Sequence, residues 1–187
     1  MDIYVANAGI SGPPGIGADE DWDRAIDVNL RAHVRAAKVL LPGWFERGGG
    51  HFVSIASTAG LLTQVGAAAY AVTKHAAVGF AEWLAVTHGD RGIGVSCVCP
   101  LGVNTALLNT ARESTDADDR MAAAAIINAG NVIEPELVAD ATVDAVREGR
   151  FLVLPHSQVL GMCRKKGLDY DRWITSMRCY QRALTAR

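Results

Sequence analysis

Four short apolar runs that alternate with helical stretches constrain this chain more than any other feature of its sequence. The runs cover residues 3–6, 51–56, 94–99 and 151–154, and each is short and apolar enough to form a buried strand. Helices are predicted over residues 19–45, over residues 70–87, and from Pro135 to just before Gly149. Strands separated by helices pair in parallel through right-handed crossovers, so the pattern predicts an α/β fold with a three-layer parallel sheet.

The length and composition indicate one domain that acts on small molecules. At 187 residues the chain needs no second domain to bury a core. Half of the residues are hydrophobic, 20% are charged and the net charge is -2, which argues against a nucleic-acid partner and against a disordered tail. The expected partners are a small-molecule substrate and other protein subunits.

Cysteine usage and hydropathy indicate a cytoplasmic protein with no membrane partner. The four cysteines show no Cys-x-x-Cys spacing, and Cys97 and Cys99 point to one face of a strand, as expected of reduced, buried thiols. No apolar run is long enough to span a membrane, and the first residues lack the basic start of a signal peptide. The five histidines are not clustered, so no metal site is expected.

Two outer segments are expected to complete the domain. Residues 106–133 mix polar residues with an apolar helical piece and are predicted to form a lid over a substrate pocket, with Met121, Ile126 and Ile127 favouring an apolar substrate. The tail, residues 157–187, is polar and basic, with Trp173 and Met177 forming an apolar stripe. One or two surface helices are predicted there.

The stretch between Ser57 and Lys74 carries the chemistry. Tyr70 and Lys74 are four residues apart in Ala-rich sequence, which places them on one helix face. A cation about 4 Å from a phenol, at an effective dielectric of about 20, is worth roughly 4 kcal/mol, or about three pKa units. The pKa of Tyr70 would then be near neutrality, and the phenol could exchange a proton with an alcohol or carbonyl oxygen. The alternative is an exposed helical pair without a chemical role.

The position of Ser57 favours the chemical role. It lies just past the predicted strand 51–56, at the sheet edge where α/β proteins build ligand sites, and thirteen residues before Tyr70. A Ser followed by Tyr-x-x-x-Lys at this spacing resembles the short-chain dehydrogenase/reductase family. The resemblance implies that Tyr70 is the general acid/base, that Lys74 lowers its pKa and holds the nicotinamide ribose, and that Ser57 hydrogen-bonds the reacting oxygen.

Three further stretches are similar to motifs of that family. Asn7, Ala8 and Gly9 resemble the end of its Asn-Asn-Ala-Gly turn beside the cofactor, with Ala6 in place of the first Asn. Asn29 matches a mid-helix Asn that relays protons through water to the lysine; the alternative is a polar residue facing solvent.

The third stretch, residues 100–105, resembles Pro-Gly-x-Val-x-Thr, a loop that meets the nicotinamide carboxamide. This match implies cofactor contacts for Pro100, Gly102, Val103 and Thr105. Leu101 takes the place of the family's glycine, and if that position needs a positive φ, leucine costs about 1 kcal/mol or more and the loop is reshaped.

The resemblance covers only the later part of the family's fold, from the first strand to about residue 154. The family's opening strand and its turn Thr-Gly-x-x-x-Gly-x-Gly have no counterpart here, which at about 30 residues per βα unit corresponds to roughly 60 to 90 residues. That turn holds the dinucleotide pyrophosphate. A partial Rossmann-like fold is therefore expected, with strand 3–6 as an unpaired apolar edge and, by analogy, a homo-oligomer formed through helices 19–45 and 70–87.

Two hypotheses follow. The first is an oxidoreductase that uses NAD or NADP to interconvert a secondary alcohol and a ketone, with Ser57, Tyr70, Lys74 and Asn29 as its catalytic residues. The second is an inactive remnant of the family that serves as a subunit-binding or scaffold module.

Overall fold

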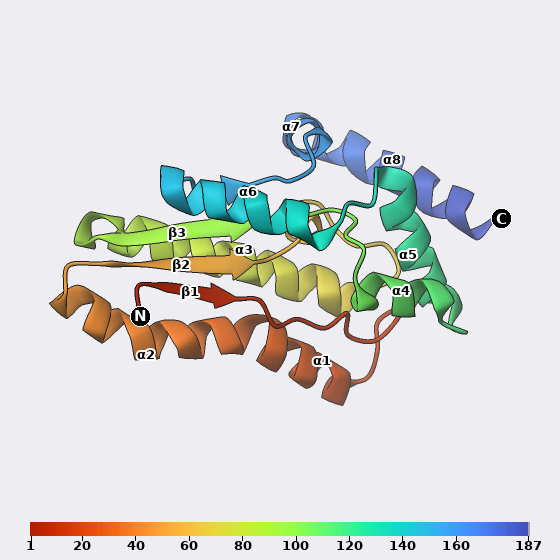
Figure 1. The fold of residues 1–187 in the computed structure, drawn as a ribbon. Helices are drawn as coiled ribbons and strands as arrows, with labels where there is room; N and C mark the ends of the chain where they lie inside the picture. Colours follow the sequence, from red (N-terminus) through yellow and green to blue (C-terminus); the bar gives the residue numbers. More distant parts are fainter. Residues whose placement is uncertain (187) are drawn as a thin grey trace.

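The computed structural model describes residues 1–186 as a four-stranded parallel sheet with helices on both faces (Figure 1). The strands follow the order β1-β2-β3-β4, which confirms the predicted α/β architecture. The strands and the helices of more than one turn are β1 (Ile3–Ala6), α1 (Asp19–Ile26), α2 (Ala32–Glu46), β2 (Gly50–Ile55), α3 (Ala68–His88), β3 (Ile93–Val98), α4 (Ala106–Glu113), α5 (Ala117–Ala129), α6 (Pro135–Glu148), β4 (Leu152–Val153), α7 (Gln158–Leu168) and α8 (Tyr170–Thr185).

The alternation of side chains along the strands separates two cores. Phe52 on β2 faces α2 and α3 and is buried together with Trp44 and Leu84 of those helices. The neighbouring Val53 faces the opposite side, where it packs with Val98 and with residues of α6. Both faces of β2 and β3 are therefore covered, as expected for buried parallel strands.

The predicted helix over residues 19–45 is one continuous helical stretch with a change of winding. Between α1 and α2 a π-helical turn spans Asp27–Arg31, and Asn29 lies in the middle of it. Such turns are often found at functional sites. Pro42 does not end the helix, because α2 continues to Glu46.

Strand β1 is an edge strand whose outer side chains lack a covering helix. Its residues Tyr4 and Ala6 pack against the core beneath α2 and α3, whereas Ile3 and Val5 point to the other face and are 51% and 49% exposed. Within the described part of the chain, β1 pairs only with β2. The expectation of an open apolar edge agrees with this arrangement.

The two ends of the predicted lid, residues 106–133, lie side by side where the chain leaves the sheet and returns to it. A parallel bridge joins Val103 to Ile133: the Ile133 N–H donates to Gly102 O at 3.0 Å, and the Asn104 N–H donates to Ile133 O at 2.8 Å. The Asn104 amide also donates to the carboxylate of Glu134 at 3.1 Å. Helices α4 and α5 lie between the two bridged residues in the chain, and in space they lie beyond the carboxyl ends of the sheet strands (Figure 1).

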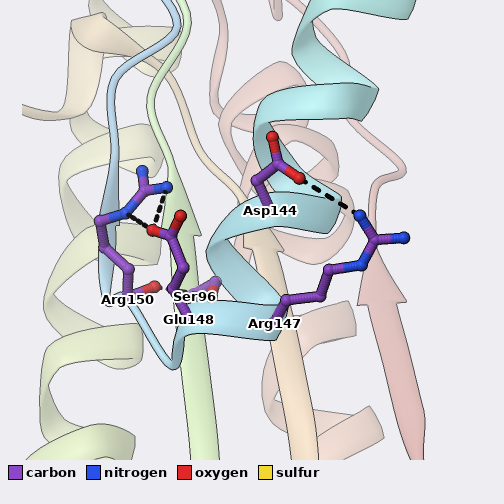
Figure 2. Close-up of polar contacts among 5 residues, drawn as sticks. All are labelled: Ser96, Asp144, Arg147, Glu148 and Arg150. Atoms are coloured by element: carbon purple, nitrogen blue, oxygen red, sulfur yellow. Dashed lines mark hydrogen bonds and ion pairs between the residues drawn. The ribbon is translucent and has the colours of Figure 1, made fainter.

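Ion pairs lie at the end of α6 and between α6 and the turn that leads to β4, at the other end of the sheet. Figure 2 shows Arg150 bound to Glu148, with a closest distance of 2.7 Å, and Arg147 bound to Asp144 at 3.4 Å. The Ser96 hydroxyl of β3 donates to Arg150 O at 2.8 Å. Exposed pairs of this kind contribute about 0–1 kcal/mol each, so they hold the turn without determining the fold.

Candidate active site

Ser57 and Tyr70 meet at the carboxyl end of β2. Ser57 follows that strand by two residues, and its hydroxyl accepts the Ala59 N–H at 3.1 Å, which caps the short 3₁₀ turn Thr58–Gly60. Tyr70 lies in the first turn of α3, where it lines the same cavity as Ser57 and lies near enough for the serine hydroxyl to lower the pKa of its phenol. The sequence predicted that these two residues lie close together, and the structure places them so.

Glycine at position 60 allows the turn after Ser57 to lie against α3. A Cβ at Gly60 would come within 2.5 Å of the Lys74 carbonyl oxygen and 2.8 Å of the Lys74 carbonyl carbon, both of which are backbone atoms. Any side chain would therefore push the turn away from the helix. The glycine at position 60 therefore allows the turn after Ser57 to lie close to α3, the helix that carries Tyr70 and Lys74.

Lys74 is buried, and its ammonium has a fixed partner. Its Nζ donates to Ile55 O at 3.0 Å and lies 5.6 Å from the centroid of the Tyr70 ring. Burial lowers the pKa of Lys74 to about 8, against a smaller opposing effect of the thiols of Cys99 and Cys97. An ammonium has three donors, so this one can make two further hydrogen bonds on the cavity side.

The expected lowering of the Tyr70 pKa is wrong for this geometry. Burial raises the pKa of Tyr70, the hydrogen bond with Ser57 lowers it by less, and the Cys99 thiol adds a further rise. A lowered pKa would require a full charge about 4 Å from the phenol. In the structure the ammonium is bound to the Ile55 carbonyl instead, and the phenol is desolvated. Tyr70 is consequently a protonated phenol at neutral pH.

Asn29 is fully buried and does not face solvent. Its Oδ1 accepts the Ile10 N–H at 2.9 Å, and its Nδ2 donates to Ile10 O at 2.9 Å and to Thr73 Oγ1 at 3.0 Å. A Cβ at Gly9 would lie 3.5 Å from Asn29 Oδ1 and 3.3 Å from Lys74 Nζ. Asn29 therefore ties the turn after β1 to α3, beside the lysine.

His33 is a buried polar residue in this region that sequence reasoning did not single out. Its Nδ1 lies 3.2 Å from the Ser54 hydroxyl, and its buried Nε2 has no hydrogen-bond partner among residues 1–186. Burial, with a contribution from the charge of Lys74, lowers the pKa of His33 to about 4. The four-residue spacing from Asn29 was the available signal, since it places both side chains on one helix face.

A cavity of about 1120 Å³ opens above Ser57, Tyr70 and Lys74. Most of the predicted cofactor-binding residues line it: Asn7, Ala8, Gly9, Pro100, Val103 and Thr105. Gly102 does not line it; its carbonyl faces inward and accepts the Ile133 N–H. The cavity thus brings together motifs from the ends of three strands, as expected at this edge of a parallel sheet.

The loop over residues 100–105 accommodates leucine in place of glycine without backbone strain. No residue other than glycine has a positive φ in the described part of the chain, so Leu101 is not strained. Its N–H donates to Nδ1 of the buried His156 at 3.1 Å, and His156 Nε2 lies 3.1 Å from the Gly102 and Asn131 carbonyls. His156 must therefore carry its proton on Nε2, and it anchors a loop whose support was not predicted from the sequence.

A second buried cation, Lys166 of α7, supports the segment that follows Ser57. Its Nζ donates to Leu61 O and Leu62 O, both at 2.8 Å, and lies 4.9 Å from the centroid of the Trp173 ring. In the sequence this lysine is one of several basic residues in a polar tail, a pattern typical of a solvated surface.

The predicted lid contributes part of the cavity wall. Ile126 lines the cavity, whereas Met121 and Ile127, which were also expected to favour an apolar substrate, do not. Leu107 and Leu108 of α4 line it as well.

The residues of the cavity fit a nicotinamide dinucleotide at its nicotinamide end. Lys74 has two further donors that could bind ribose hydroxyls, and the cavity lining also includes Thr105 and the turn at Asn7–Gly9. The lining is otherwise mostly apolar, which suits an uncharged ring.

Among residues 1–186, none of the helices combines the length and apolar character that a bilayer crossing requires.

Comparisons with known proteins point to one family. The short chain dehydrogenase family matches residues 1–116. A protein of Streptomyces coelicolor, described as a candidate ketoacyl reductase, is 35% identical over 179 residues, covering 87% of this chain and 66% of that protein. The curated relatives that this chain matches are longer, and it spans between 40% and 66% of their length.

Solved structures of the same family superimpose on this one. A short-chain dehydrogenase/reductase from Burkholderia phymatum in complex with NAD gives a TM-score of 0.77 at 26% identity, over 91% of this chain and 66% of the other. A short-chain dehydrogenase from Sphingobium yanoikuyae in complex with NADPH has the same fold, with a TM-score of 0.73 at 23% identity, over 95% and 65% of the two chains. By its sequence and its structure, this chain belongs to the short-chain dehydrogenase/reductase family of oxidoreductases.

Proposed function

We propose that this chain provides the catalytic portion of an NAD- or NADP-dependent oxidoreductase that interconverts a secondary alcohol and a ketone. One observation carries this proposal: Ser57, Tyr70 and Lys74 together line a largely apolar cavity, with the Lys74 ammonium 5.6 Å from the centroid of the Tyr70 ring. Two neutral hydroxyls of this kind in an apolar lining suit an oxygen that changes between carbonyl and hydroxyl.

The residues divide the proton chemistry among them. Ser57 orients the reacting oxygen by a hydrogen bond, and Tyr70 donates the proton when a ketone is reduced. Because the pKa of Tyr70 is raised, the phenol holds its proton at neutral pH and is ready to act as the acid. The opposite reaction needs the phenolate, and the Ser57 hydroxyl favours that form because it lowers the pKa of Tyr70. Bound nicotinamide supplies or accepts the hydride.

Cofactor binding would rest on three places in the chain. Lys74 would bind ribose hydroxyls, the turn at Asn7–Gly9 would approach the cofactor with its backbone, and Pro100, Val103 and Thr105 would contact the nicotinamide. The solved structures of the relatives contain NAD in one case and NADPH in another, so both cofactors are candidates.

A second copy of the chain is the proposed protein partner. Several apolar side chains on the outer faces of α2 and α3 are exposed, with Val39 at 79%, Val86 at 87% and Trp83 at 52%. A dimer would cover them. Sedimentation should show the variant Val86→Glu shifted to monomer, whereas Leu168→Glu, at an equally exposed site on α7, should leave the assembly unchanged. If both variants shift to monomer, or if neither does, the proposed interface is wrong.

Calorimetric titration with NAD and with NADP tests the cofactor assignment directly. A saturable heat with one of the two is expected, and Lys74→Met should weaken it because the ribose donors are lost. Tyr70→Phe should retain the binding and lose the turnover, since it removes only the acidic hydroxyl. No detectable heat with either cofactor at millimolar concentration would refute an enzymatic role for this chain and would favour the scaffold hypothesis.

A further inference from the structure

The C-terminal helix α8 has an apolar face that the protein itself leaves incompletely packed. Trp173, Met177 and Tyr180 are spaced four and three residues apart, so they lie on one face, and all three line the cavity. None of the residues of α8 is fully buried. This apolar face is therefore only half-covered, and the uncovered side is the cavity.

The facing wall is built from small residues. Helix α5 presents mostly alanines to the cavity, with Asp119, Ile126 and Asn128 as its larger residues there; the alanines are Ala122, Ala123, Ala125 and Ala129. Alanines opposite a tryptophan and a methionine leave open space between the two helices rather than an interlocked core. The two walls are nevertheless fixed, because the Tyr180 hydroxyl donates to Ala125 O at 2.9 Å.

Two polar side chains on this half of the cavity are used within the protein, and Thr63, Asn128 and Lys165 add polar groups to a lining that is otherwise apolar. The Gln64 amide donates to Ala122 O at 3.2 Å, and the carboxylate of Asp119 accepts from the Ser114 hydroxyl at 2.8 Å. A ligand in this half meets mainly carbon atoms. Binding energy there would come from the burial of apolar surface.

The volume is sufficient for more than a nicotinamide ring. Pockets for drug-sized ligands span about 300–1,000 Å³, and this cavity measures about 1120 Å³. The half beside Asn7–Gly9 and residues 100–105 is the part that would hold the cofactor. The half lined by residues of α4, α5 and α8 remains for the substrate.

We propose that the substrate is a bulky, apolar ketone or alcohol whose body packs between α5 and α8, and that Met177 and Trp173 determine this preference. The proposal rests on the proposed function, because it takes Ser57 and Tyr70 as the groups that hold the substrate oxygen. The apolar body completes the packing of α8, and the carbonyl reaches the two hydroxyls at the base of the cavity.

Two ketones that differ only in the size of their side groups test the proposal. Benzophenone carries two phenyl rings on its carbonyl, and acetone carries two methyl groups. In calorimetric titrations of the 187-residue chain, benzophenone should bind saturably, and acetone should show no saturable heat at the same concentrations. Equal behaviour of the two ketones would overturn the proposal.

Two alanine variants on α8 locate the site. Met177→Ala should weaken benzophenone binding about tenfold, as expected for lost methylene contacts in an apolar pocket. Ile174→Ala is the matched control, because Ile174 lies on the same helix, is 43% exposed and does not line the cavity. Met177→Trp should block benzophenone by filling the space. An equal loss in Met177→Ala and Ile174→Ala, with unchanged melting temperatures, would place the ligand elsewhere and refute the role of α8.

Titrations with and without cofactor separate the two proposals. Saturable benzophenone binding without any binding of NAD or NADP would support the apolar site and contradict the oxidoreductase function of this chain. Cofactor binding without benzophenone binding would support the function and overturn the substrate class.

Discussion

Acid should destabilise this protein through the buried imidazole of His33. Its pKa in the folded chain is about 4, below the ordinary value of 6.5, because the ring is buried and Lys74 is charged nearby. An unfolded chain therefore binds a proton as the pH falls below 6.5, whereas the folded chain stays neutral until about pH 4. The stabilising contribution is complete above pH 6.5 and is lost between pH 6.5 and pH 4. Down to pH 4.5 the loss amounts to about 2.5 kcal/mol.

A non-titrating variant isolates this contribution from that of the other ionisable groups. In His33→Asn the amide can still reach the Ser54 hydroxyl, and it takes no proton. Urea unfolding followed by circular dichroism at pH 8 and at pH 4.5 gives the change in stability for each protein. The wild type should lose about 2.5 kcal/mol more than the variant, or about 1 M more in urea midpoint at a typical m-value. Parallel losses in the two proteins would show that His33 is not held neutral by burial, and the reasoning would fail.

Two substitutions test how the site is held together. Asn29→Leu removes three buried hydrogen bonds, two of them to Ile10, and should lower the free energy of unfolding by about 3 kcal/mol; a change below about 1 kcal/mol in urea titrations would contradict this account. Gly60→Ala would place a Cβ 2.5 Å from the Lys74 carbonyl oxygen and should cost about 1–3 kcal/mol, measured as a lower melting temperature. Gly79→Ala on α3 is the control, since nothing lies within 4 Å of its Cβ and alanine favours helix; a comparable loss there would remove the steric explanation.

The architecture was predictable because it depends on patterns that many residues share. Apolar runs separated by helical stretches specified the parallel sheet, and the observed strands lie within one residue of the predicted limits. The meeting of Ser57 with Tyr70 was predictable too, since a strand end and the following helix start must adjoin at that edge of the sheet. Both inferences depend only on the spacing of residues along the chain, which can be read from the sequence.

The direction of the Tyr70 pKa was not predictable from spacing. Two residues at helical spacing can face each other, yet the sequence does not say that the Ile55 carbonyl takes the Lys74 ammonium or that the phenol is desolvated. Desolvation depends on all the elements that surround a group and can outweigh a single charge.

The buried polar anchors were missed for a related reason. His33 and His156 stand alone in the sequence and Lys166 lies among other basic residues, yet each of the three finds its partners on elements distant along the chain. Lys166, for example, binds carbonyls more than 100 residues away. Isolated histidines and a lysine in a basic tail are most often solvated, so only the tertiary structure identifies these three as supports.

The bridge between Val103 and Ile133 has an evolutionary consequence. Because the chain leaves and re-enters the domain at the same point, insertions, deletions or wholesale exchange of residues 106–132 would not alter the spacing of β3 and α6. Changes there act within α4 and α5, while the segment after β2 that carries Ser57 and the helix α3 that carries Tyr70 keep their positions. The cavity wall that Leu107, Leu108 and Ile126 form can therefore change during evolution without any change in the sheet.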